Sequence, residues 1–365
     1  MKRACFQNTK TGINDFELFS ADLRKPGLLL QNKIFQLLLL VIMFAGCGGN
    51  PLNVDVSTID IKLEIKRLDH DIYKVDSHNL QESIAELKQK YSSFFDTYNE
   101  NVIAIGDPSG SFYLSYLKAF LNDTVRVSSR LKIDSVFSDL TNLENELESA
   151  FRHYRYYFPK RTIPQIITMI SGFNQSVVLT NEAIGISLDN YLGADCPFYV
   201  MLGLPEYKRQ NMYSDKIPTD VLYAWAISEF DFDESRNNLI SNMIYQGKII
   251  YFLDAMFPKE PDYLKIGFRP EKLEWCKNNE SGMWTFLVEH KLLFNTDRMN
   301  IVRFVNPAPF TSNFSPESPG RTGVWLGWQI VRKYMKKNPG ITLPGLMSEN
   351  DYQKILNDSG YSPEY

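Results

Sequence analysis

The chain has 365 residues, of which 44% are hydrophobic and 13% aromatic, and its formal net charge at pH 7 is −4. This composition is enough for a large core, in one large domain or in two closely packed ones. Because the charge is nearly balanced and no basic run could follow a phosphate backbone, we predict that the protein does not bind nucleic acid.

Residues 1–47 have the features of an export signal. An apolar run over residues 34–45 follows Lys33 and is itself followed by Gly46 and Cys47. A basic residue, an apolar run and small residues in this order are typical of a secretory signal, and the run is too short to span a bilayer comfortably. The alternative is a short membrane anchor. The end of the run resembles the bacterial lipobox, in which cleavage precedes the cysteine and the cysteine is lipidated. We therefore predict attachment to a membrane through a lipid on Cys47.

The residues after Cys47 indicate which membrane and which side. The next residue is Gly48, not an aspartate, which favours sorting to the outer membrane. The segment 48–57 has no acidic cluster of the sort linked to surface display in Bacteroidetes. We predict that this segment is a tether and that the lipid-anchored protein faces the periplasm.

Residues 58–360 are predicted to form one large domain, helical over residues 70–160. Apolar and charged residues alternate over residues 59–68, which predicts a half-exposed strand. Helical patterns follow at 80–91, 112–121 and 142–158.

Residues 161–360 are predicted to contain a sheet followed by more helices. Short apolar runs between Gly and Asn turns predict strands at 166–170, 176–179 and 182–189, and tight turns of this kind favour a small antiparallel sheet. Two long segments, 220–230 and 237–257, are apolar on nearly every face, which predicts buried helices. Further helices are expected at 270–278, 282–291, 324–336 and 351–357.

Cys196 and Cys276 are the cysteines of the mature body. In an extracytoplasmic protein they could form one disulfide. Two separate buried thiols are the other interpretation, because a large core does not need the cross-link. The cysteine pattern favours neither.

Several stretches of the sequence resemble the gliding motility lipoprotein GldB family of Bacteroidetes. They are residues 155–159, 170–180, 184–189, 224–230, 242–248 and 318–323. Together they cover the mature chain almost end to end. The resemblance implies an envelope lipoprotein that is needed for gliding and, by association, for type IX secretion, and that works with other gliding or secretion proteins.

The two long apolar helices also resemble, more weakly, the helix pair of gluzincin-like zinc peptidases, which carries the zinc ligands. The resemblance implies that the ligand and base positions fall on Ala224, Trp225 and Ser228, with the last ligand at Gln246. None of these side chains binds zinc as a peptidase requires. The expected fold is therefore α+β and mostly helical, with a zincin-like helix pair beside a small antiparallel sheet, and we predict no metal and no cofactor.

Four residues are candidate contacts for a ligand. Arg321 lies at the start of a predicted helix, where a cation opposes the macrodipole, so it either pairs with an acid or binds a ligand's carboxylate. Asn174 and Gln175, in a turn between strands, either satisfy backbone groups or hold a peptide strand. Trp325 either packs in the core or lines a cleft. The ligand in question is a peptide or a cell-wall fragment.

The sequence favours a non-enzymatic outer-membrane lipoprotein whose inactive peptidase-like domain serves gliding or secretion through protein contacts. The alternative is an envelope hydrolase, either a peptidase with a relocated metal or a peptidoglycan-acting enzyme that uses paired carboxylates. Candidates for such a pair are Glu182, Asp189, Glu229 and Asp254. An open cleft beside Arg321 would support binding, whereas a cleft filled by Trp225 would argue against catalysis.

Overall fold

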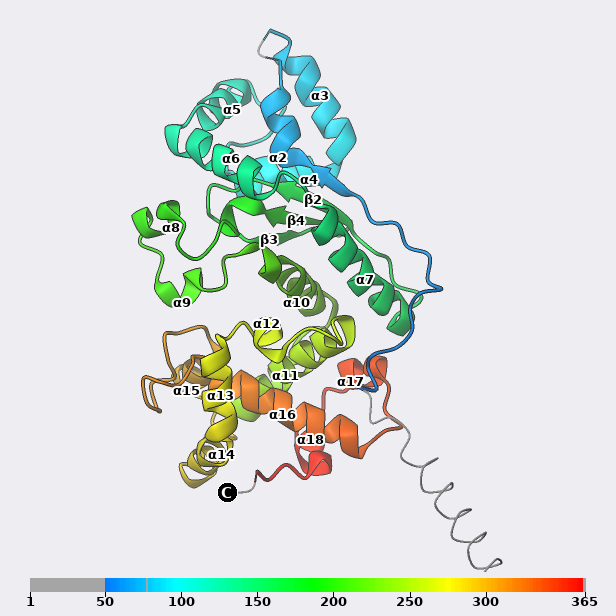
Figure 1. Ribbon diagram of the computed structural model, residues 1–365, viewed down its shortest axis with the longest axis vertical. Helices are drawn as coiled ribbons and strands as arrows, with labels where there is room; N and C mark the ends of the chain where they lie inside the picture. Colours follow the sequence, from blue (N-terminus) through cyan, green and yellow to red (C-terminus); the bar gives the residue numbers. More distant parts are fainter. Residues whose placement is uncertain (1–49, 77, 364–365) are drawn as a thin grey trace, which may run out of the picture. The chain divides into compact units, whose positions relative to one another are not determined.

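Helices pack against both faces of a small four-stranded sheet in the computed structural model, which describes residues 50–76 and 78–363 (Figure 1). The strands are β1 (Ile65–Arg67), β2 (Gln165–Met169), β3 (Val177–Leu179) and β4 (Ala183–Ser187). Their order is β1-β2-β4-β3. Strands β1 and β4 each run parallel to β2, and β3 runs antiparallel to β4.

The prediction of a mostly helical α+β fold with a small sheet is confirmed, but the sheet is mixed, not antiparallel. The turn signal after β2 indicates a chain reversal and does not say which strand becomes the neighbour. Here β4 lies between β2 and β3, so the reversal leads to the far edge of the sheet. Only Ile65–Arg67 of the alternating segment 59–68 is a strand, and Ile65 lies opposite Ile166.

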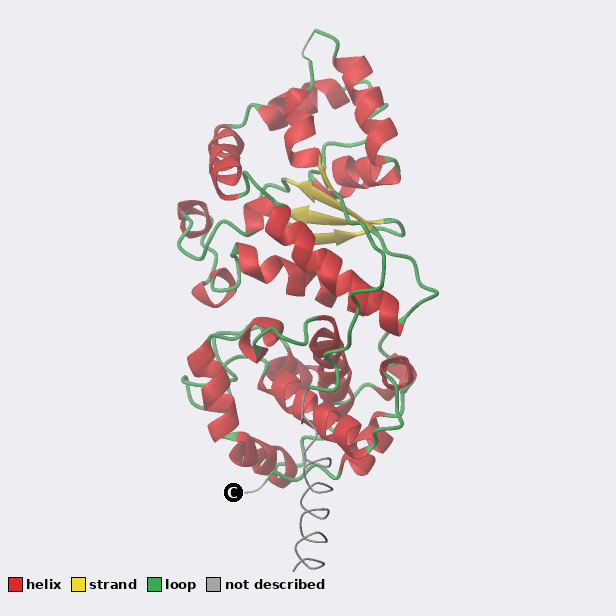
Figure 2. Cartoon of the chain, turned by 45° about the vertical axis from the view of Figure 1, so that its right-hand side comes forward, coloured by secondary structure: helices red, strands yellow, loops and turns green. Residues whose placement is uncertain are grey.

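Side chains that alternate along β2 and β4 divide the core between the two faces of the sheet. Ile167, Met169 and Ala183 belong to one apolar cluster, with the helices between residues 68 and 121. Ile166 and Ile184 belong to a second, larger cluster with the helices that follow. Figure 2 shows helices on both sides of the strands. This is the period-two pattern of a sheet that is buried on both faces.

The first cluster is built from short helices, most of them before β2. In chain order the helices up to β2 are α2 (Leu68–Asp71), α3 (Leu80–Tyr91), α4 (Ser93–Thr97), α5 (Tyr113–Leu121), α6 (Thr124–Val136) and α7 (Thr141–Tyr157). Helix α4 lies so close to the sheet that a Cβ at Gly185 would overlap the ring of Phe94. Glycine at this position therefore sets the spacing between helix and strand.

The second cluster contains the two long apolar helices, α10 and α11. The helices after β4 are α8 (Pro197–Met201), α9 (Glu206–Arg209), α10 (Ile217–Glu229), α11 (Leu239–Met256), α12 (Asp262–Ile266), α13 (Pro270–Asn278), α14 (Glu280–Glu289), α15 (Arg298–Val305), α16 (Thr322–Lys337), α17 (Leu343–Ser348) and α18 (Tyr352–Ser359). Helix α11 is buried on nearly every face. None of the helices within residues 50–76 and 78–363 is long and apolar enough to cross a membrane.

Helices α11 and α16 cross at a pair of glycines. A Cβ added to Gly327 would overlap the carbonyl of Met243, and one added to Gly247 would overlap the carbonyl of Gly327. The two backbones therefore touch at this point. Small residues allow such an approach because no side chain stands between the helices.

A buried carboxylate ties the end of α11 to α12 and α16. The side chain of Asp254 is 4% exposed and lies 2.9 Å from Lys265 Nζ and 2.8 Å from Arg332 Nη2. It also accepts a hydrogen bond of 2.8 Å from Trp328 Nε1. Arg332 pairs in addition with Asp262, at 2.7 Å. Each buried charge thus has a partner, which buried charges require.

The structure also decides between the two interpretations of the cysteines. Cys196 and Cys276 are both buried and both are free thiols, so the possible disulfide is absent. Cys276 lies in α13, and burial raises the pKa of its thiol well above the ordinary value. A thiol in such surroundings behaves as a small apolar side chain.

We predict that Gly327→Ala lowers the free energy of unfolding by roughly 3 kcal/mol or more, because the new methyl group must separate two helices in contact. The matched control is Gly282→Ala in α14, where an added Cβ has nothing within 4 Å. That variant should be neutral or more stable by about 0.5–1 kcal/mol, because alanine favours helix. Urea unfolding of both variants measures the difference, and equal effects would contradict the close helix contact.

Candidate functional site

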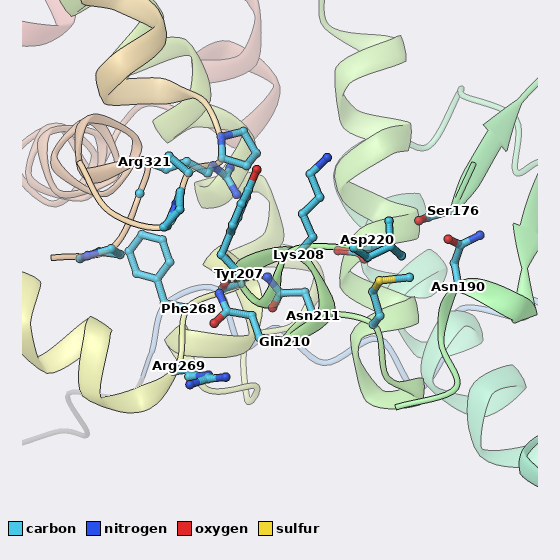
Figure 3. Close-up of a pocket in the computed structure, with 18 of the residues that line it drawn as sticks. Ser176, Asn190, Tyr207, Lys208, Gln210, Asn211, Asp220, Phe268, Arg269 and Arg321 are labelled. Atoms are coloured by element: carbon cyan, nitrogen blue, oxygen red, sulfur yellow. Dashed lines mark hydrogen bonds between the residues drawn. The ribbon is translucent and has the colours of Figure 1, made fainter. Parts of the chain in front are cut away.

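A cavity of about 440 Å³ lies where several loops meet between the sheet and the later helices. Many of the side chains that line it are basic, aromatic or amide, and Figure 3 labels ten of the lining residues. The lining includes Phe173, Asn174, Tyr191, Tyr207, Lys208, Gln210, Asn211, Asp220, Phe268, Arg269, Lys272 and Arg321. Cavities of this size hold small ligands or a short stretch of polypeptide.

The wall on the sheet side is shaped by Asp189. Its carboxylate accepts hydrogen bonds from the backbone N–H groups of Ser171, at 3.2 Å, and Phe173, at 2.6 Å. Both Gly172 and Phe173 have positive φ, 74° and 66°, so the chain turns sharply here. This turn places Phe173 and Asn174 at the cavity. Burial raises the pKa of the Asp189 carboxyl to about 6, while the backbone N–H groups act in the opposite direction.

Helix α8 packs against the same wall and exposes apolar side chains. The rings of Phe198 and Tyr199 each lie 5.9 Å from the ring of Phe173. Next to them Val200 and Met201 are 58% and 62% exposed, and Leu202 after the helix is 47% exposed. Three consecutive exposed apolar residues beside a cavity are typical of a surface that contacts another molecule.

The opposite wall holds Arg321, which precedes α16 and has φ of 60°. Its guanidinium donates to the carbonyl of Ile266, at 3.3 Å, and to the hydroxyl of Tyr223, at 3.4 Å. Tyr223 in turn donates to Oε1 of Gln246, at 2.6 Å. No carboxylate pairs with Arg321 within the described residues, so the internal ion pair considered from the sequence does not form there. The guanidinium is therefore oriented by neutral groups.

The positions implied by the peptidase resemblance are occupied by groups with other roles. Trp225 is 5% exposed and its ring meets that of Tyr154 edge-on at 6.3 Å. Ser228 donates to the carbonyl of Trp225 at 2.8 Å, within its own helix. Ala224 has no polar side-chain atom, and Gln246 is held by Tyr223. No group of three or more His, Cys, Asp or Glu side chains in the described part of the chain is placed to hold a metal ion.

Two of the four candidate contact residues, Asn174 and Arg321, line the cavity, on opposite walls. Gln175 and Trp325 are not among its lining residues. The carbonyl of Gln175 accepts from Asn190 at 3.2 Å, which is a turn contact, and Trp325 is buried within α16. Cys47 lies outside the described residues.

Three of the four acids considered for a catalytic pair are held by different partners. Asp189 holds the turn after β2, and Asp254 belongs to the cluster with Lys265 and Arg332. Glu229 pairs with Arg161, and Glu182 is exposed beside β4.

The sequence did not single out Tyr207, Lys208 or Tyr223. Tyr207 and Lys208 lie in α9, a short helix that packs few apolar residues and so gives no periodic signal. The one usable signal was the run of polar and aromatic residues after Pro205, in a segment with no predicted element. Tyr223 looks from the sequence like any aromatic residue on a buried helix.

A larger cavity of about 720 Å³ lies beside the tether residues 53–57. Most of the charged residues that line it are acids, among them Glu146, Asp215 and Glu260. Burial and the two neighbouring acids raise the pKa of Glu146. None of the four candidate contact residues lines this cavity, so the smaller one is the candidate site.

Fold and cavity together define a mostly helical α+β protein with a basic and aromatic cavity beside a small mixed sheet. The model of the family described as "Gliding motility protein GldB" matches residues 49–363, and the chain therefore belongs to this family of gliding motility lipoproteins. The family resemblance stated from the sequence is confirmed. No curated protein and no solved structure matches the chain.

The buried Asp189 should make stability depend on pH. Because burial raises the folded-state pKa to about 6, this group's contribution to stability is fully present below about pH 4 and is lost as the pH rises through 6. In Asp189→Asn the titration is gone. Between pH 4 and pH 7 the wild type should therefore lose stability relative to the variant. The free energy of unfolding of the variant minus that of the wild type should rise by on the order of 3 kcal/mol. Urea unfolding at several pH values checks this.

The exposed acid Glu182 provides the control for this experiment. Glu182→Gln should follow the wild type across the same pH range. Parallel curves for the wild type and Asp189→Asn would show that the buried carboxyl does not titrate in this range.

Proposed function

We propose that this protein is a non-catalytic outer-membrane lipoprotein that supports gliding, and type IX secretion with it, by holding another envelope protein at the cavity. The observation that carries the proposal is the open cavity flanked by Arg321, a cation with no acidic partner within the described residues. A charged group kept without an internal partner is available to a ligand. The peptidase-equivalent positions nearby hold no zinc ligand, which supports binding over hydrolysis.

The apolar surface of α8 supports a protein as the partner. Val200, Met201 and Leu202 are exposed beside the wall that Phe173 forms. Apolar side chains at a contact surface gain stability when a partner removes them from water. The cavity can contact charged and amide groups of a ligand, and the exposed residues 200–202 beside it can contact apolar side chains. A polypeptide segment carries both kinds of group.

Attachment to the membrane is the part of the proposal that rests on Cys47. The export signal and lipobox-like residues before it support cleavage and lipidation at this cysteine. We predict that Cys47→Ser prevents lipidation, so the protein should leave the membrane fraction and incorporate no labelled palmitate. The control is Cys196→Ser, a buried thiol of the folded body, which should stay in the membrane fraction. Membrane-bound, palmitate-labelled Cys47→Ser would contradict the lipid anchor.

A charge reversal at the cavity tests the function itself. Lys208 lines the cavity, is exposed and has no ion pair among the described residues, so Lys208→Glu should fold and yet repel the ligand. In a gliding strain deleted for its own copy, this variant should fail to restore spreading of colonies and secretion. The matched control is Lys132→Glu on the exposed side of α6, which should restore both.

Two results would contradict the proposal. If Lys208→Glu fully restored gliding and secretion, the cavity would not be needed for gliding. Stoichiometric zinc in the purified protein, together with a melting temperature that falls when a chelator is added, would favour the peptidase instead. Metal content and melting are measured on residues 51–365, which form one compact unit.

A further inference from the structure

The charges around the cavity are not balanced by the protein itself. Its acid, Asp220, is already engaged by Lys216 Nζ, at 2.5 Å, and by the Tyr191 hydroxyl, at 3.1 Å. Of the cations, Arg269 pairs with Glu206 at 2.7 Å. These contacts leave no free carboxylate at the cavity within the described residues.

Two of the remaining cations differ in what holds them. Lys272 donates to three consecutive backbone carbonyls, the nearest at 2.8 Å, and so fixes the loop before α16. Lys208 makes no side-chain hydrogen bond or ion pair within the described part of the chain. Arg321 donates only to Ile266 and Tyr223. All three N–H donors of Lys272 are used, so Lys208 and Arg321 are the two cations at the cavity that have no carboxylate partner among the described residues and keep N–H donors free.

These two cations come from different elements and face the same space. In the view of Figure 3 the side chain of Tyr207 lies between those of Arg321 and Lys208, and all three residues line the cavity. A guanidinium offers five N–H donors in a planar fork, of which Arg321 uses two internally. The fork matches a carboxylate, and an ammonium group beside it adds a second charge-assisted contact.

The lining near these cations suits an amide chain. The side chain of Asn211 donates to the carbonyl of Gly267 at 3.0 Å, which leaves its own oxygen as an acceptor. Gln210 makes no side-chain hydrogen bond within the described residues. The rings of Phe173 and Phe268 provide apolar surface in the same cavity. Peptide N–H groups and one apolar side chain would find partners there.

We propose that the cavity binds the C-terminal end of a protein, with its terminal carboxylate between Arg321 and Lys208. This inference rests on the proposed function and names the chemistry of the ligand. A stem peptide of the cell wall also carries a carboxylate, but it is short and joined to polar sugars. A protein C-terminus can continue as an apolar chain over Val200 and Met201 of α8, which lie beside the Phe173 wall.

The test compares two forms of one probe. A mixture of N-acetylated octapeptides with randomised apolar residues between serines is prepared with free C-terminal carboxylates and, separately, as C-terminal amides. Residues 51–365 are incubated with each mixture, and the peptides retained on ultrafiltration are counted by mass spectrometry. The free acids should be retained at least about tenfold better than the amides, since a charge-assisted contact to a carboxylate is lost in the amide.

Variants place the effect at the cavity. Lys208→Gln and Arg321→Gln should each reduce the preference for the acid toward equal retention, whereas Lys132→Gln on α6 should keep it. Lys208→Gln is an exposed substitution, so the test stands even if Arg321→Gln folds poorly. The melting temperature of each variant reports folding.

Three outcomes would overturn the inference. If acids and amides are retained equally, the protein binds peptides, as the proposed function requires, but it does not recognise their terminal carboxylate. Retention of a soluble muropeptide digest in preference to the peptides would move the ligand to the cell wall. Retention of neither mixture would remove C-terminal recognition, while the gliding test with Lys208→Glu would still judge the proposed function separately.

Discussion

The contact between helices α11 and α16 is the constraint on which the later half of the structure depends. Gly247 and Gly327 bring the two backbones together, and Asp254 then reaches both Lys265 and Arg332. Because Lys265 lies in α12, the carbonyl of the next residue, Ile266, is fixed where it accepts from Arg321. The helix contact, the buried ion cluster and the cavity wall are thus connected through Asp254, Lys265 and Ile266.

The sequence predicted elements better than it predicted their pairing. The bounds of α3 and α13 agree with the periodic patterns residue for residue, and the two long apolar helices lie where buried helices were expected. Helices α6 and α15 were not predicted, although Asp123 and Asp297 cap their first turns. The sheet was mispaired because the strand neighbours are set by long-range packing, which no local turn signal records.

The candidate site was predictable in part for the same reason. Arg321 and Asn174 stood out from local rules, a cation opposing a helix dipole and an amide in a turn. Lys208 and Tyr223 became significant only through the fold, which brings Lys208 to the same cavity as Arg321 and places Tyr223 between Arg321 and Gln246. The two walls come from segments more than a hundred residues apart. Neither periodicity nor spacing in the sequence could therefore predict that these segments line one cavity. The family match relates the chain to gliding motility, and the proposal about the ligand comes from the residues that line the cavity.

The backbone at Arg321 has a conformation that costs stability for any residue other than glycine. Its φ of 60° lies in the left-handed region, which costs a residue with a Cβ roughly 1–2 kcal/mol and costs glycine almost nothing. Selection for stability alone would place glycine there, as at Gly267, whose φ is 73°. Arginine recovers part of the cost through its bonds to Ile266 and Tyr223. Glycine at this position would remove the backbone cost, and it would also remove the guanidinium and its two hydrogen bonds.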